Sequence, residues 1–189
     1  MTESQMDLSG KLLIAMPGMG DPRFDRSVVF MCAHSGDGAM GLIINQPAAD
    51  LEFGDLLEQL DIEPPSRDMA TQIHVGGPVE HGRGFVLHSS EYDIEESTLR
   101  VDEKFSMTAT LEILEDMAHH RGPKQALLAL GYSGWAPGQL ESEISHNGWL
   151  TCDATTDIVF ARDNAQKWEM ALATLGIGPL TLSASAGRA

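Results

Sequence analysis

The segment from Val28 to Asn45 constrains the fold of this chain of 189 residues more than any other. Residues 28–34 (VVFMCAH) are apolar at successive positions, which indicates a central strand covered on both faces. Residues 35–38 (SGDG) follow, and glycine and aspartate tolerate the positive φ angles of a tight hairpin turn. Residues 40–45 (MGLIIN) are the expected returning strand. Hairpins therefore dominate the first half of the predicted fold.

Strands and single helices alternate irregularly along the rest of the chain. Further strands are expected at Lys11–Met16, Gln72–Val75, Gly84–His88, Gln125–Leu130, Trp149–Cys152 and Asp157–Phe160. Helices are expected at Phe53–Leu60, Thr110–His120, Gly138–Asn147 and Asn164–Leu175. Asp50 is the expected cap of the first helix, and residues 91–104 read as an acidic irregular segment. This order predicts an α+β fold and not a strict βαβ alternation.

The length favours one domain, with two domains as the alternative. We expect a single domain over residues 10–182, with flexible tails at 1–9 and 183–189. No apolar run approaches the roughly 18 residues of a membrane span, and the acidic N-terminus lacks the basic region of a signal peptide. These features favour a cytoplasmic protein in which Cys32 and Cys152 are reduced and buried, with one disulfide as the alternative.

The charge balance argues against nucleic acid as a direct partner. The chain has 12 basic and 28 acidic residues, a net charge of −16. A nucleic-acid binder usually carries a basic patch, whereas the arginines here are scattered along the chain. Binding to an anionic membrane surface is disfavoured for the same reason.

Residues 131–135 (GYSGW) follow an apolar strand and precede a helix, which is the setting of a hydrolase nucleophile elbow. That motif needs glycine at its fifth position, where Trp135 stands. It also needs an acid and then a histidine later in the chain, and here the one later histidine, His146, lies on the adjacent helix. We therefore favour a tight turn whose tryptophan anchors the next helix. On that helix Gln139, Glu143 and His146 share one face, either as a solvated stripe or as a binding surface.

The remaining motifs are incomplete as chemical sites. Cys32 and His34 alternate on one strand, and Cys152 is a conceivable third ligand, but zinc needs three or four. Asp116 and His119 resemble half of a di-iron motif without its other half. The Gly76-Gly77-Pro78 segment lacks a phosphate-binding pattern, so a backbone crossing or tight turn is expected. We predict no metal and no cofactor.

Hairpin geometry separates two of the candidate residues. If the 35–38 turn is in register, His34 lies beside the turn and Asn45 faces the region of Val28. At about 3.3 Å per residue the two side chains are then roughly 20 Å apart. Asn45 and Gln46 are expected to cluster with residues 25–27 at the opposite end of the hairpin.

The chain resembles the YqgE/AlgH family over roughly residues 10–178. The matching segments, in order, are residues 11–17 (KLLIAMP), 24–29, His34 with 38–45 (GAMGLIIN), 76–79 (GGPV), 131–144 (GYSGWAPGQLESEI), Asn147 with 149–150, and 168–176. The resemblance implies one α+β domain with a branched, partly barrel-like mixed sheet surrounded by helices. It also implies a bacterial cytosolic protein of a family whose biochemical function is not established, and the AlgH name implies regulation of exopolysaccharide (alginate) production.

Three functions follow as hypotheses. We favour a non-enzymatic binding or regulatory module that acts through a protein or small-molecule partner. The second hypothesis is a hydrolase-like enzyme that pairs Glu143 with His34 or His146. The third is a direct transcriptional regulator. The expected recognition surface, in one or two parts, consists of His34, Asn45, Gly76, Gly77, Pro78, Trp135, Gln139 and Glu143.

Overall fold

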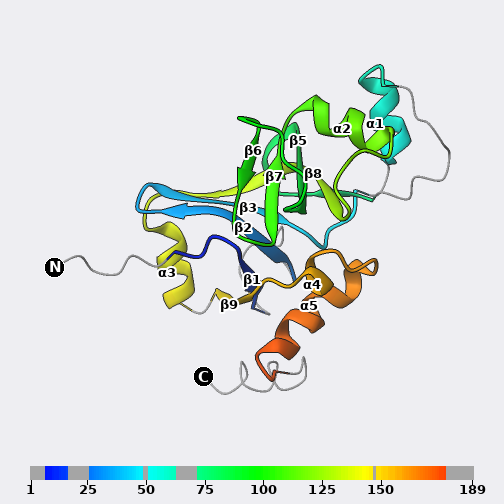
Figure 1. Ribbon diagram of the computed structural model, residues 1–189. Helices are drawn as coiled ribbons and strands as arrows, with labels where there is room; N and C mark the ends of the chain where they lie inside the picture. The colour runs from blue at the N-terminus through cyan, green and yellow to red at the C-terminus, as the bar shows by residue number, and fades with distance from the viewer. Residues whose placement is uncertain (1–6, 17–25, 49–50, 63–71, 147, 178–189) are drawn as a thin grey trace.

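A nine-stranded sheet organises the computed structural model, which describes residues 7–16, 26–48, 51–62, 72–146 and 148–177 (Figure 1). Its strands run in the order β6-β7-β5-β8-β3-β2-β1-β9, and β4 pairs with β8 off this path. The strands are β1 Lys11–Ala15, β2 Val28–Ser35, β3 Gly38–Ile43, β4 Ile73–Val75, β5 Val79–Ser89, β6 Thr98–Arg100, β7 Phe105–Thr108, β8 Ala126–Trp135 and β9 Trp149–Asp153.

The branch point of the sheet is β8. Its first half pairs with β5 on one side and, in parallel, with β4 on the other. Its second half leaves β4 and pairs with β3, with Gly41 opposite Ser133 and Ala39 opposite Trp135. The change of neighbour lets the sheet curl into a half-barrel, which confirms the predicted α+β class and branched sheet.

Five helices cover the sheet in the described ranges: α1 Phe53–Gln59, α2 Leu111–Ala118, α3 Gln139–Ser145, α4 Thr156–Val159 and α5 Asn164–Thr174. Alternate residues of each strand face different helices. Leu12 and Phe30 belong to the core that the curled sheet encloses with α4 and α5. Leu13 and Val29 point to the opposite face, which α3 covers. Helices α1 and α2 pack on a third cluster with Val86 and Leu128 (Figure 1).

The enclosed core joins the two halves of the sheet. The rings of Phe30 from β2 and Phe105 from β7 meet edge to face with centroids 5.0 Å apart, although their strands lie far apart in the sheet order. Both side chains are fully buried. Aromatic pairs of this geometry contribute about 1 kcal/mol beyond the area that they bury.

Several local predictions were wrong. Residues 131–135 continue β8 as a strand and do not form a turn. The segment predicted as a strand from Asp157 is the short helix α4, because the hydroxyl of Thr155 accepts a hydrogen bond from the Ile158 amide and caps it. Glu52, and not Asp50, is the N-cap of α1, and Asp50 itself lies outside the described residues.

Strands β6 and β7 were missed because they are short and lack a glycine-rich turn. The carboxylate of Asp102 joins them by accepting hydrogen bonds from the amides of Lys104 and Phe105 at 2.8 and 2.9 Å. This Asx turn replaces the glycine signal that marks other hairpins. Residues 7–9, placed in the tail, pack against the domain, since Leu8 is buried in the cluster beneath α3. The C-terminal boundary at 182 lies outside the described residues.

Candidate functional site

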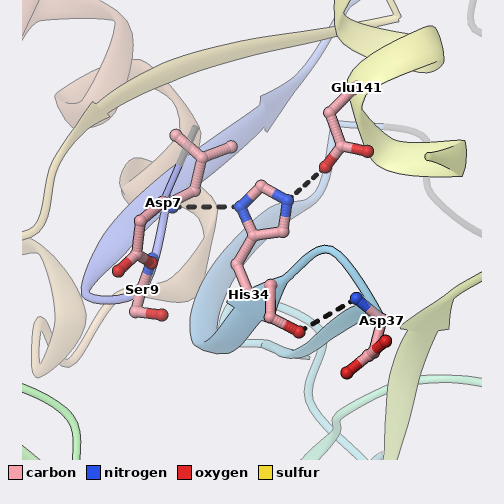
Figure 2. A network of polar contacts seen from close by, with 7 residues as sticks. Asp7, Ser9, His34, Asp37 and Glu141 are labelled. Carbon is pink, nitrogen blue, oxygen red and sulfur yellow. Dashed lines mark hydrogen bonds and ion pairs between the residues drawn. The ribbon is translucent and has the colours of Figure 1, made fainter. Parts of the chain in front are cut away.

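His34 lies near the end of β2, where the N-terminal segment and α3 meet (Figure 2). The backbone amide of Leu8 donates to its Nδ1 at 3.1 Å, and its Nε2 contacts the carboxylate of Glu141. On either side of Leu8, the Ser9 amide donates a hydrogen bond to the carboxylate of Asp7, and this bond is the main reason that the pKa of the Asp7 carboxyl is lowered. His34 therefore fastens two peripheral elements to the hairpin.

The hydrogen bonds of His34 define its tautomer. Since Nδ1 accepts from an amide N–H, the ring proton of the neutral imidazole is on Nε2 and is donated to Glu141. No lone pair is left to remove a proton from a substrate. A general base needs such a lone pair within hydrogen-bond reach of its target. In this arrangement the pair is a structural latch.

His34→Ala is expected to loosen this latch. The substitution removes the acceptor for the Leu8 amide and the donor to Glu141, so the free energy of unfolding should fall by about 1–2 kcal/mol. Amide exchange at Leu8 should accelerate. His146→Ala is the matched control, because His146 is exposed and its hydrogen bonds to described residues stay within its own helix and turn. Equal stability and equal exchange at Leu8 in both variants would contradict the latch.

Glu143 holds two tryptophans at the same end of the fold. Its Oε1 accepts hydrogen bonds from the indole N–H of Trp135 at 3.2 Å and of Trp149 at 3.0 Å. Its Oε2 accepts a hydrogen bond from the side-chain amide of Gln139. The side-chain oxygen of Gln139 in turn accepts a hydrogen bond from the Ala136 backbone amide at 2.9 Å. The two indole rings meet edge to face with centroids 6.1 Å apart. We call this group the indole clamp.

Among the described contacts, Glu143 does not form the predicted acid–base pair with His34 or His146. Both of its carboxylate oxygens are engaged, and His34 pairs with Glu141 instead. His146 hydrogen-bonds the backbone oxygen of Ser142. The hydroxyl of Ser133 is buried and donates to the Gly76 oxygen at 3.2 Å, so it is not presented as a nucleophile.

The clamp and latch support an exposed surface made of two loops. The β2–β3 hairpin tip, residues 35–37, and residues 136–139 are exposed. The loops lie against each other, because a Cβ built on Gly38 would stand 2.6 Å from the Trp135 oxygen. The Asp37 amide is held by the Ser35 hydroxyl at 3.1 Å. We call residues 35–37 and 136–139 the hairpin-end surface.

The predicted site residues form separate groups. His34, Trp135 and Glu143 lie beneath the hairpin-end surface, and Gln139 is part of that surface. Asn45 lies at the other end of the hairpin, as the register predicts. Its side chain accepts a hydrogen bond from the Val28 amide and donates one to the Arg26 carbonyl oxygen, each at 2.9 Å. Gln46 donates to the Ser27 hydroxyl nearby, and residue 25 of the expected cluster lies outside the described residues.

Gly76-Gly77-Pro78 forms the expected backbone crossing. Gly76 donates its amide to Leu130 and accepts from the Ile43 amide, each at 2.8 Å. A Cβ on Gly76 would lie 2.3 Å from the Gly131 oxygen, and one on Gly77 would lie 2.2 Å from Tyr132 backbone atoms. The small glycines thus allow the β4–β5 connection to cross close to β8. The segment belongs neither to the group beneath the hairpin-end surface nor to the group around Asn45.

Cys32 and Cys152 are free, buried thiols. Burial raises the pKa of Cys32 to about 12, so this thiol is a poor metal ligand or nucleophile near neutral pH. No group of three metal-ligating side chains is found in the part of the chain that the structure describes. Nor does that part contain a helix with the length and apolar character to cross a membrane.

A buried polar cluster escaped the sequence analysis. His74 lies between the Leu128 oxygen at 3.2 Å and the Asn164 side-chain oxygen at 3.1 Å, and burial lowers its pKa. Lys167 donates to the Ile44 oxygen at 2.6 Å, and burial lowers its pKa to about 8. The burial of Lys167 was not predicted from the sequence. Helix α5 also carries exposed polar residues, and the position of a lysine along the helix does not by itself show that it is buried.

Lys167→Met is expected to change the pH dependence of stability. Because the folded pKa is about 8 and the unfolded value is 10.5, the unfolded chain holds more protons between these pH values, and the free energy of unfolding rises with pH. Between about pH 7.5 and pH 9 this contribution amounts to about 1 kcal/mol. Urea unfolding at both pH values should show this rise in the wild type relative to the variant. A difference between the two proteins that is independent of pH would contradict it.

The fold and its polar contacts together define a class: a one-domain α+β half-barrel whose histidine, glutamate and lysine side chains secure structure. The model of the family described as AlgH-like matches residues 12–180. The chain therefore belongs to the AlgH-like family, and the resemblance to the YqgE/AlgH family is confirmed.

Relatives and solved structures agree with this assignment. A UPF0301 protein of Ruegeria pomeroyi is 62% identical over 97% of this chain and its own full length. A UPF0301 protein of Paracoccus denitrificans is 51% identical over 99% of this chain and its own full length. The solution structure of the AlgH protein from Pseudomonas aeruginosa covers both chains completely with 42% identity and a TM-score of 0.80. A Corynebacterium diphtheriae protein, 21% identical, shares the fold with a TM-score of 0.75 over 96% of this chain and 93% of its own.

Proposed function

We propose that the chain is a non-enzymatic binding module that acts through a partner. The observation that carries the proposal is the engagement of each candidate acid–base group in a structural contact. His34 uses both ring nitrogens, and Glu143 uses both carboxylate oxygens. A catalytic constellation needs a base with a free lone pair beside a nucleophile or a bound water.

The hairpin-end surface is the proposed recognition surface. Exposed residues at 35–37 and 136–139 rest on the indole clamp and on the His34 latch, so their backbone is held before a partner arrives. A pre-organised surface loses less conformational entropy on binding than a flexible one. The central crossing at 76–78 and the Asn45 end hold structure and are left out of this proposal.

The proposal includes a cytoplasmic setting and regulation without direct contact to nucleic acid. Two free, buried thiols support a reducing compartment. The net charge of −16 disfavours direct contact with nucleic acid. A regulatory role would then pass through a partner protein or a small molecule.

Two measurements test this function. Purified protein should hydrolyse a panel of model ester, amide and phosphoester substrates no faster than the buffer blank. A measurable rate that falls about a hundredfold or more in His34→Gln or Glu141→Gln would establish acid–base catalysis and overturn the proposal.

The second measurement is cross-linking in cells. A photoreactive amino acid at Asp37, on the hairpin-end surface, should yield a discrete adduct. The same amino acid at Glu169, exposed on α5, is the matched control and should yield none. Equal adducts at both positions, or none at Asp37, would remove the hairpin-end surface as the recognition site.

A further inference from the structure

An apolar pocket of about 240 Å³ lies between α1, α2 and the β5–β8 part of the sheet, away from the hairpin-end surface. Its principal walls are leucines from α1, α2 and β8, namely Leu56, Leu60, Leu111, Leu114, Leu128 and Leu130. The volume is below the roughly 300 Å³ at which small-molecule sites usually begin. It suits one or two inserted side chains.

The pocket contains features that are typical of an uncovered interface. Leu111 on its rim is 54% exposed, and the buried Thr110 hydroxyl oxygen in its lining has no hydrogen-bond partner within the described structure. A buried hydroxyl without a partner costs about 1–3 kcal/mol. Glycines form part of the wall, and a Cβ on Gly82 would meet nothing within 4 Å. A partner could supply both the apolar filling and the missing hydrogen bond.

The helices around the pocket are acidic. Helix α1 with its cap exposes Glu52, Asp55 and Glu58, and α2 exposes Glu112 and Glu115. Neither helix contains a lysine or an arginine. The basic residue in the lining, Arg83, lies 3.6 Å from Glu80 and stacks over the Phe85 ring. A rim of this charge attracts cationic partners and repels anionic ones.

We propose that this pocket is the docking site for a basic amphipathic segment of a partner protein. One or two large apolar side chains of that segment fill the space between the leucines. Its lysines or arginines face the carboxylates of α1 and α2, and a polar group of the segment pairs with the Thr110 hydroxyl. This mode is helix-in-groove recognition. The inference goes beyond the proposed function, because it assigns a second surface and the chemistry of its partner.

The test uses two fluorescein-labelled probes, each of about 14 residues or four helical turns. One consists of leucine and lysine in amphipathic order, and the other has glutamate in place of lysine. Fluorescence anisotropy should show binding of the lysine probe only, and the affinity should fall between about 50 and 300 mM salt because exposed charges are screened. Equal binding of both probes would overturn the electrostatic argument.

Variants of the full chain locate the site. Gly84→Leu places a side chain against the pocket leucines, because a Cβ at Gly84 would contact Leu128 and Leu130 at 3.8 and 3.9 Å, and it should weaken binding about tenfold or more. Leu111→Lys changes an exposed rim residue and should weaken binding without altering the core. Gly54→Leu is the matched control, since Gly54 is exposed on α1 outside the pocket with nothing within 4 Å.

The outcomes are distinct. Unchanged affinity in both Gly84→Leu and Leu111→Lys would show that the lysine probe binds the acidic surface without using the pocket, and would overturn the proposal. If decanoate shifts the pocket amide resonances while neither peptide binds, the pocket is a small-molecule site and the proposal is also overturned. Neither result affects the non-catalytic assignment, which depends on the turnover measurement.

Discussion

Gly77→Ala is expected to destabilise the protein by about 3 kcal/mol or more. An added Cβ would lie 2.2 Å from the Tyr132 carbonyl carbon and oxygen and 2.4 Å from the Ser133 nitrogen. These are backbone atoms of the branch-point strand β8, so relief requires that the β4–β5 connection move away from β8. The midpoint of urea unfolding should fall accordingly, with the slope unchanged.

Gly82→Ala is the matched control for this experiment. Gly82 lies in β5, a few residues beyond that connection, and a Cβ there would meet nothing within 4 Å. Its free energy of unfolding should stay within about 0.5 kcal/mol of the wild type. If Gly77→Ala were as stable as Gly82→Ala, the close crossing of the β4–β5 connection over β8 would be wrong.

The second large effect is expected for Glu143→Ala. Trp135 and Trp149 are 7% and 2% exposed, and both indole N–H groups would lose their bond to the carboxylate. The loss of a buried acceptor costs about 1–3 kcal/mol for each donor, so we expect a decrease of about 3 kcal/mol in the free energy of unfolding. The near-ultraviolet circular dichroism of the tryptophans should weaken, because the edge-to-face geometry is no longer held.

Two variants distinguish the loss of the indole hydrogen bonds from the loss of a negative charge. Glu143→Gln keeps one side-chain oxygen as an acceptor for the indoles and should lose less than half as much stability. Glu169→Ala removes an exposed carboxylate from α5 and should lie within about 0.5 kcal/mol of the wild type. If Glu143→Ala behaved like Glu169→Ala, the clamp would contribute nothing to stability.

The sequence predicted those strands and helices that can be recognised from residues close together in the chain. The hairpin of β2 and β3 has a glycine-rich turn and apolar strands, and Ser35 pairs with Gly38 as expected. The separation of His34 from Asn45 followed from that register. Helices α1, α2 and α5 were found from their apolar spacing and α3 from the proline at its start and the Asn-Gly pair at its end, with ends shifted by a few residues.

The candidate site was predicted only in part. Helical spacing predicted that Gln139 and Glu143 share one face, and the two side chains are hydrogen-bonded. Trp149 was not predicted as a partner of Glu143, because it lies on β9 and the spacing within one helix does not show which strand residue packs against it. Glu141 was overlooked as the partner of His34, because 107 residues separate the two side chains in sequence. The apolar pocket was missed because its leucines come from three separate segments, each of which reads as an ordinary core face.

The sequence by itself determined the α+β class, the central hairpin and the family, since these depend on residue order and on short-range backbone preferences. The tertiary structure decided which polar groups meet. It placed a glutamate between two indoles, passed Gly76 and Gly77 over β8, and buried Lys167 against the Ile44 carbonyl just after β3. The physical reason is that packing and hydrogen-bond geometry join residues distant in the chain, and periodicity within one segment carries no information about such partners.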